Sequence, residues 1–180
     1  MNKTRLTTKY FPAKRLAMLA VLSAMALISF MIEGLFPPLF LPGAKMGISN
    51  IFSMLALFLL GPLEAIVVVA VRTVLGSLFG GGISTLLYSF SAGMVAIVVG
   101  CYLVQFAFPK VSIVAISVVS AVVHNVSQVL VFCLVSNTPQ MLYYAPWMAL
   151  LGIVAGVIVG FAVWLIVKNL PQKMLSSLAE

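Results

Sequence analysis

The sequence predicts an all-α integral membrane protein with six transmembrane helices and both termini in the cytoplasm. Hydrophobic residues make up 63% of the 180 residues, and charged residues only 7%. The mean hydropathy is +1.24, and apolar runs alternate with short stretches rich in Pro, Gly or Lys. A spanning helix needs roughly 20 apolar residues and satisfies its own backbone hydrogen bonds. This length therefore accommodates five or six spans and leaves no room for a soluble domain.

Proline and glycine mark the boundaries of the predicted spans. Pro37-Pro38 ends the first span, because proline cannot continue a helix. The second span is short for a bilayer, so the Pro-Gly loop before it is expected to dip into the membrane. Gly61-Pro62 forms a tight turn into the third span, and Gly80-Gly81-Gly82 ends it. The predicted spans cover residues 16–36, 48–60, 62–79, 84–108, 111–135 and 143–167.

Three regions follow from these boundaries. Residues 1–15 form a basic cytoplasmic segment, residues 16–167 the six-helix transmembrane domain, and residues 168–180 a cytoplasmic tail. The apolar run after the basic segment has no small-residue cleavage site. We therefore expect a first span rather than a removed signal peptide.

The positions of Lys and Arg predict which side is cytoplasmic, because short cytoplasmic loops are enriched in these residues. Only Lys45 lies on the other side, and Arg72 lies within a span. The basic residues lie at the ends of apolar runs without interleaved aromatic residues, which argues against nucleic-acid binding. The predicted cytoplasmic set is Lys3, Arg5, Lys9, Lys14, Arg15, Lys110, Lys168 and Lys173.

The stretch P-G-A-K-M-G-I-S-N at residues 42–50 is a candidate ligand-binding segment. It places Lys45 between two glycines, and Ser49 or Asn50 can cap the helix that follows. A helix N-terminus beside a lysine suits an anion. The alternative is an ordinary loop between helices.

Polar residues also recur inside the predicted spans. Arg72 lies about ten residues from the cytoplasmic end of the third span, near mid-membrane. Such a residue needs a partner or a ligand. The steps of three, four and four between four residues of the fifth span place them on one helical face. These residues are Ser117, Ser120, His124 and Gln128, with Asn125 beside them.

Together these side chains predict a substrate-binding site below the outer surface. Lys45 and Arg72 would supply charge, and the amide and imidazole groups would supply hydrogen bonds. Two alternatives stay open: Arg72 and Glu33 could form a structural ion pair, and His124 could be a packing residue. Ser84, Tyr88 and Ser91 share a face of the fourth span and could border the same site. The candidate binding residues are Glu33, Lys45, Asn50, Arg72, His124, Asn125 and Gln128.

The sequence argues against catalysis and against a metal or cofactor. Cys101 and Cys133 lie inside apolar runs without C-x-x-C or nearby His, so they are expected to be packing residues. The only acidic residues are Glu33, Glu64 and Glu180. A phosphate-binding GKS or GKT loop is absent from the sequence, so ATP-driven transport would need separate ATPase subunits.

Four ordered motifs resemble a bacterial membrane family, the Gx transporter family, often labelled heptaprenyl diphosphate synthase component I. They are P-G-A-K-M-G-I-S-N (42–50), R-T-V-L-G-S-L (72–78), H-N-V-S-Q (124–128) and Y-A-P-W (144–147), followed by a ridge of glycines. That family in turn looks like the substrate-binding S components of energy-coupling-factor (ECF) transporters. The resemblance implies an S-component-like six-helix bundle in the bacterial cytoplasmic membrane.

The resemblance also implies a partner surface on the first helix. In S components an Ala-x-x-x-Ala motif faces the transmembrane coupling subunit. Ala20 and Ala24 match this motif, although Ala13 and Ala17 have the same spacing.

Two functional hypotheses follow. The first is an importer subunit that captures a small anionic or amphipathic metabolite from the outer side and assembles with coupling and ATPase subunits. The second is a non-catalytic membrane partner of a soluble polyprenyl or heptaprenyl diphosphate synthase. Prenyl diphosphate synthases normally bind Mg²⁺ diphosphates through aspartate-rich motifs, and this sequence contains no Asp. The chain is therefore not expected to be the catalyst itself.

Overall fold

The computed structural model describes residues 13–36 and 47–171, and the regular structure of these residues is helical. Two short helical segments accompany the α-helices: a π-helical turn, η1 (Ser77–Gly81), and a 3₁₀ helix, η2 (Pro139–Tyr144). The α-helices are α1 (Ala13–Leu35), α2 (Asn50–Leu59), α3 (Pro62–Gly76), α4 (Gly82–Ala107), α5 (Ile113–Ser136) and α6 (Ala145–Asn169).

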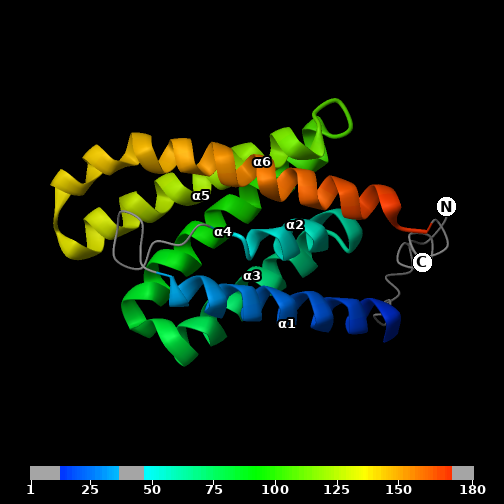
Figure 1. The fold of residues 1–180 in the computed structure, drawn as a ribbon, viewed down its shortest axis with the longest axis horizontal. Helices are drawn as coiled ribbons and strands as arrows, with labels where there is room; N and C mark the ends of the chain where they lie inside the picture. Colours follow the sequence, from blue (N-terminus) through cyan, green and yellow to red (C-terminus); the bar gives the residue numbers. More distant parts are fainter. Residues whose placement is uncertain (1–12, 37–46, 172–180) are drawn as a thin grey trace, which may run out of the picture.

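Five helical stretches are long and apolar enough to cross a membrane, which confirms the predicted multi-pass helical bundle. They correspond to α1, α3 with the start of η1, α4, α5, and η2 with α6. The start of α1 and the end of α6 lie at the same end of the bundle (Figure 1). Their placement on the cytoplasmic side of a membrane stays a prediction from the basic residues.

The remaining helix, α2, is short and central. It has 10 residues, so it extends only about 15 Å, half the thickness of a hydrocarbon core. It begins about halfway along the bundle and runs toward the end where α1 starts (Figure 1). The five longer helices pack in the order α1, α3, α4, α5, α6, and α2 contacts α1, α3, α4 and α6. The N-terminus of α2 therefore lies inside the bundle.

The glycine ridge of α6 packs directly on α5. A Cβ atom added at Gly152, Gly156 or Gly160 would lie 2.5–2.8 Å from a Cα atom of α5, at Val122, Val118 and Val114 respectively. Only glycine permits this approach of two backbones. The ridge is thus an internal packing surface.

Arg15 anchors α1 to the turn between α2 and α3. Its guanidinium pairs with Glu64 at 2.7 Å and donates to the carbonyl oxygen of Leu60. Glu64 lies in the first turn of α3, where a carboxylate interacts favourably with the helix dipole. These contacts hold the start of α1 against the end of α2.

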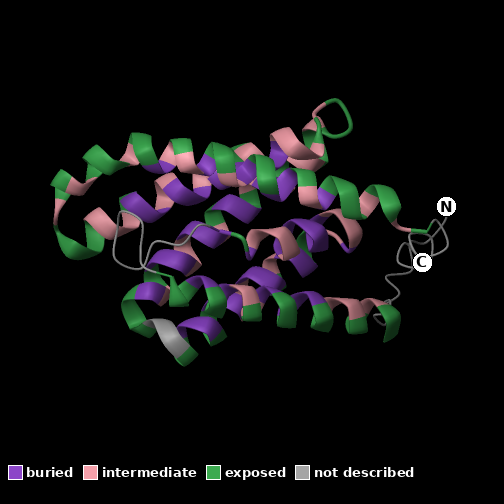
Figure 2. Cartoon of the chain, in the orientation of Figure 1, coloured by how far each residue is buried: buried purple, intermediate pink, exposed green. Residues whose placement is uncertain are grey.

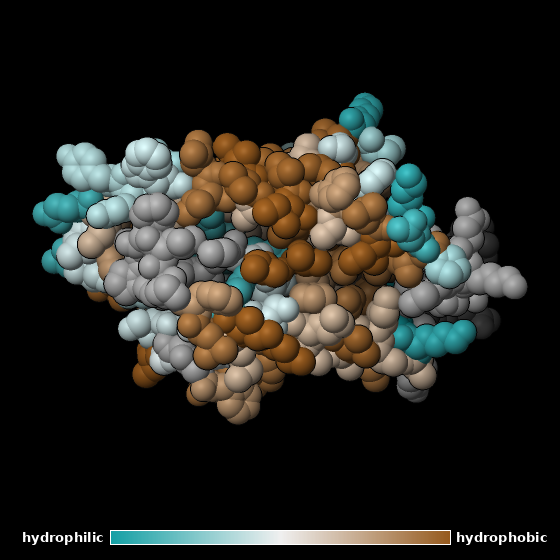
Figure 3. All heavy atoms as spheres, in the orientation of Figure 1, coloured by the Kyte–Doolittle hydropathy of each residue, from teal (hydrophilic) through white to brown (hydrophobic). Residues whose placement is uncertain are grey.

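Burial follows the bundle geometry. Buried residues face inward on each long helix, and exposed residues face outward (Figure 2). A broad hydrophobic band covers the middle of the face in Figure 3, and hydrophilic atoms gather at its two ends. Many large apolar side chains are exposed, among them Leu134, Ile83 and Leu78 at 73–81%. This pattern suits lipid contact rather than water.

Candidate functional site

The candidate site begins at the tight turn before α2. Gly47 has a positive φ of 85°, and its carbonyl accepts from the backbone N–H of Asn50 at 2.9 Å. This turn aims two further N–H groups at α1. Glu33 Oε1 accepts hydrogen bonds from Ile48 N and from Ser49 N, the latter at 3.2 Å. A carboxylate from another helix therefore satisfies amides that would otherwise be unpaired at the start of α2.

Arg72 approaches the same turn from α3. Its side chain is only 2% exposed. Nη1 donates to Ser49 Oγ, and Nη2 donates to Asn50 Oδ1 at 2.5 Å. Ser49 Oγ in turn donates to Glu33 Oε2 at 3.4 Å. Arg72 and Glu33 are thus connected through the Ser49 hydroxyl, an arrangement that differs from the direct ion pair considered from the sequence.

The polar face of α5 points into the bundle. Ser117, Ser120, His124 and Gln128 are each at most 7% exposed. Within the described residues, several of their polar atoms have no hydrogen-bond partner. These atoms are Ser117 Oγ, Ser120 Oγ, His124 Nδ1, and both Oε1 and Nε2 of Gln128. Such atoms are rare in a membrane interior, because an unsatisfied polar group is costly there.

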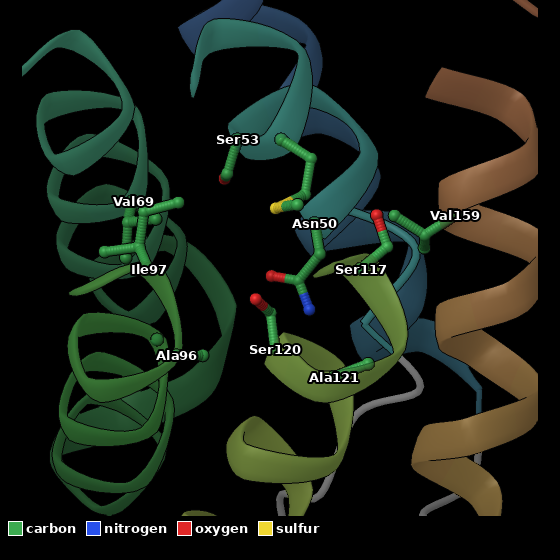
Figure 4. Close-up of a pocket in the computed structure, with 11 residues that line it drawn as sticks. Asn50, Ser53, Val69, Ala96, Ile97, Ser117, Ser120, Ala121 and Val159 are labelled. Carbon is green, nitrogen blue, oxygen red and sulfur yellow. The ribbon is translucent and has the colours of Figure 1, made fainter. Parts of the chain in front are cut away.

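Two small cavities are lined by residues at or next to the N-terminus of α2. The first has a volume of about 20 Å³ and lies between Asn50, Ser53, Ser117 and Ser120, with apolar side chains around them. In Figure 4, Asn50 extends from α2 toward Ser120 of α5, and Ser53 and Ser117 border the same space. A cavity of this size holds about one water molecule.

The second cavity lies on the Arg72 side of the turn and has a volume of about 10 Å³. It brings charged and neutral polar groups from four helices together. Its polar lining residues are Glu33, Ser49, Arg72, Thr73, Ser89, His124 and Gln128. Five of the seven candidate residues thus border one or other cavity: Glu33, Asn50, Arg72, His124 and Gln128.

Of the other two candidate residues, Asn125 borders neither cavity. Asn125 is buried, but its Nδ2 donates to the carbonyl oxygen of Met148 at 3.0 Å, on the α6 side. It therefore ties α5 to α6, and we leave it out of the proposed binding group. Lys45 lies outside the described residues, so its part in binding stays a prediction.

The fourth helix contributes different residues from those expected. Ser84 is exposed and Ser91 only partly buried, whereas Thr85 and Ser89 are buried. Ser89 borders the second cavity, and its hydroxyl has no partner among the described residues. Tyr88 is buried as expected and packs on Phe132, with ring centroids 5.3 Å apart. Sequence spacing located a polar face but chose the wrong serines, since two overlapping faces fit the same helix.

Ser49 and Ser53 are further site residues that the sequence analysis did not include as ligand groups. Both are at most 2% exposed, and each borders one of the cavities. Their spacing of four residues was a usable signal, because it places both on one face of a helix.

Ala20 and Ala24 of α1 lie on the outside of the bundle. Both are exposed, as are Ala13 and Ala17, so all four are available to a partner or to lipid. The structure therefore does not choose between the two Ala pairs.

The membrane bundle and its polar interior agree with a family comparison. A family model described as heptaprenyl diphosphate synthase component I matches residues 22–166. This chain belongs to that family. The match to the component I family covers all the residues that border the two cavities. It confirms the family predicted from the four sequence motifs.

Beyond the component I family model, the comparisons add no close relative. No similar curated protein and no similar solved structure was found. Functional conclusions for this member of the component I family therefore depend on its own residues and geometry.

Proposed function

We propose that this chain is a membrane substrate-binding subunit that holds a small metabolite inside its helical bundle, in the manner of an importer's capture component. One observation carries the proposal. Buried polar atoms of α2, α4 and α5 that lack partners among the described residues border two cavities near the start of α2, one of which Arg72 also borders.

A purely structural role explains this arrangement poorly. Polar residues that only stabilise a membrane bundle are expected to pair with one another, as Asn125 pairs with the backbone of α6. The Gln128 amide has no such partner among the described residues, although it is only 2% exposed. Intramembrane polar groups with free hydrogen-bonding capacity are typical of substrate pathways.

The described structure represents a closed form of the proposed site. Each cavity accommodates about one water molecule, so uptake of a metabolite requires neighbouring helices to separate. Since α2 reaches only halfway along the bundle, α1 and α6 are not bridged by it in the other half. We propose that the metabolite enters through that half, from the outer side.

Mass spectrometry of small molecules that copurify with the detergent-solubilised protein tests this function. The parent protein is expected to carry a molecule that Gln128→Leu loses. Gln105→Leu is the matched control, because Gln105 is exposed on α4 and lines neither cavity. Equal recovery of the molecule from all three proteins, or none from the parent, would contradict the proposal.

A second candidate function is that of a membrane partner for a separate prenyl diphosphate synthase. The family match favours it, because the family is described as component I of such an enzyme. The chain itself contains three acidic residues and no Asp, which is too few carboxylates for an Mg²⁺-diphosphate site. In this function the chain would anchor or supply a catalytic subunit rather than catalyse.

Copurification separates the two candidates. An importer subunit should recover coupling and ATPase subunits, whereas a component I partner should recover a soluble synthase. We propose the outer face of α1 around Ala20 and Ala24 as the contact surface in either case. Replacing both with Leu should abolish recovery of the partner, and Ala162→Leu, at a partly exposed position of α6, should not.

A further inference from the structure

We propose that the interior site takes an uncharged polar group, such as an amide or a hydroxyl, and that Glu33 acts as its resident counter-charge to Arg72. This inference rests on the proposed binding function and narrows its ligand. It replaces the anionic group that Lys45 and Arg72 predict from the sequence.

Part of the hydrogen-bonding capacity of Arg72 is already used inside the protein. Its Nη1 and Nη2 atoms donate to Ser49 and Asn50, respectively. The Ser49 hydroxyl in turn donates to the Glu33 carboxylate. Its Nε atom has no partner among the described residues. The contacts to Ser49 and Asn50 use two of the five guanidinium N–H groups, and the remaining groups can bind a neutral carbonyl or hydroxyl oxygen.

The N-terminus of α2 is occupied in the same way. The first amides of a helix form a ready site for an anion, because they lack intrahelical partners. Here Glu33 Oε1 accepts from the amides of Ile48 and Ser49. The carboxylate of α1 therefore stands where an external anion would bind.

The groups that lack partners require both donors and acceptors from a ligand. Gln128 offers an NH₂ donor and a carbonyl acceptor, and both are unpartnered among the described residues whichever way its amide is oriented. Serine hydroxyls both donate and accept. An anion supplies acceptors only, so it would leave the Gln128 carbonyl unsatisfied. An amide or hydroxyl group can satisfy both ends.

The balance of charge around the cavities also favours an uncharged ligand. Among the described residues bordering the two cavities, Arg72 and Glu33 are the pair of opposite charge, connected through Ser49. Among the described residues that border the cavities, none would compensate the charge of an additional anion. Burying such an uncompensated charge is strongly unfavourable, whereas a hydrogen-bonded neutral group is not.

Thermal unfolding of the purified protein with acetamide and acetate tests the inference. The two probes are similar in shape and differ in charge, and their four heavy atoms limit binding to the millimolar range. Acetamide is expected to raise the melting temperature of the parent protein, with an apparent affinity at least about tenfold above that of acetate. Gln128→Leu should lose the acetamide response, and Gln105→Leu should keep it.

Glu33→Ala provides the complementary measurement, because it removes the resident carboxylate and leaves Arg72 unbalanced. Acetate should then raise the melting temperature of Glu33→Ala by occupying the position of the missing carboxylate. Acetamide should raise it by less. If this variant does not fold, Glu33→Gln keeps the side-chain shape while removing the charge. It should respond to acetate more strongly than the parent does.

Three outcomes of the melting measurements would overturn the inference. They are a parent response to acetate as strong as that to acetamide, a parent response to neither probe, or no acetate response in either Glu33 variant. An anionic molecule that copurifies with the parent and is lost in Gln128→Leu would also overturn it. That last result would leave the proposed binding function intact, so the two failures are distinguishable.

Discussion

Arg72 Nη2 of α3 donates to Asn50 Oδ1, the side chain of the first residue of α2, at 2.5 Å. This contact places a guanidinium against the start of a short helix inside the bundle. The neighbouring Ser49 hydroxyl links Arg72 to Glu33, so hydrogen bonds around the Arg72 guanidinium connect α1, the start of α2 and α3. The stability and the binding capacity of the bundle should therefore respond together when Arg72 is changed.

Arg72→Ala should lower the free energy of unfolding by about 3 kcal/mol, since it leaves the buried Glu33 carboxylate without its counter-charge. The double variant Arg72→Ala, Glu33→Ala should recover part of this loss but should not recover ligand binding. Reversible unfolding in detergent micelles measures both effects.

Arg15→Ala is the control for this comparison. It breaks the ion pair with Glu64, but Arg15 is 27% exposed, so its loss should reduce stability by only about 1 kcal/mol. If Arg15→Ala destabilises the bundle as much as Arg72→Ala, the central position of Arg72 has no special energetic role.

On α5, the amide of Asn125 has a structural role, and the amide of Gln128 is the proposed binding group. Asn125→Leu should reduce stability by about 0.6 kcal/mol, the average for a hydrogen bond between membrane helices, because its bond to Met148 is lost. Ligand binding should persist. Gln128→Leu should abolish ligand binding and leave stability nearly unchanged, since its amide has no described partner to lose.

Unfolding and small-molecule recovery, measured on the same two samples, check this contrast. Loss of the copurifying molecule in Asn125→Leu with unchanged recovery in Gln128→Leu would show that we have assigned the two amides the wrong way round.

The contact between α5 and α6 should tolerate no side chain at the centre of the glycine ridge. A Cβ at Gly156 would lie 2.5 Å from Val118 Cα and 3.0 Å from the carbonyl oxygen of Ser117. Gly156→Ala should therefore destabilise the bundle by about 2 kcal/mol, because two backbones must move apart. Val157→Ala, at a 46% exposed neighbour, should leave the melting temperature nearly unchanged. Similar melting temperatures for the two variants would contradict this packing.

Membrane orientation is testable by cysteine accessibility. With Cys101 and Cys133 replaced, a cysteine at Ser136 should react with a membrane-impermeant reagent added from outside the cell, and one at Ser112 should not. Ser136 ends α5, and Ser112 caps its other end by accepting from Ala115 N at 3.1 Å. The expectation follows from the basic residues on the side of Ser112. The opposite labelling pattern would place the proposed entrance in the cytoplasm.

Helix number, the approximate helix boundaries and the inward face of α5 could be predicted from the sequence by itself. Long apolar runs form helices in a bilayer, and the Pro-Pro, Gly-Pro and Gly-Gly-Gly stretches between them mark the boundaries. The spacing from Ser117 to Gln128 fixes a shared face because helical geometry is local and repeats every 3.6 residues. The short second span also followed from counting residues, and it is the feature that creates the interior site.

Only the tertiary structure decided which polar groups are paired with each other. From the sequence, Arg72 needed either a ligand or a partner such as Glu33, and the fold brings Glu33 of α1 onto the start of α2 and beside Arg72 through Ser49. It likewise turns Asn125 toward α6 while leaving its neighbours on the cavity side. These pairings depend on the rotation and depth of each helix relative to the others. Packing between helices sets those two quantities, and no periodicity within one helix specifies them.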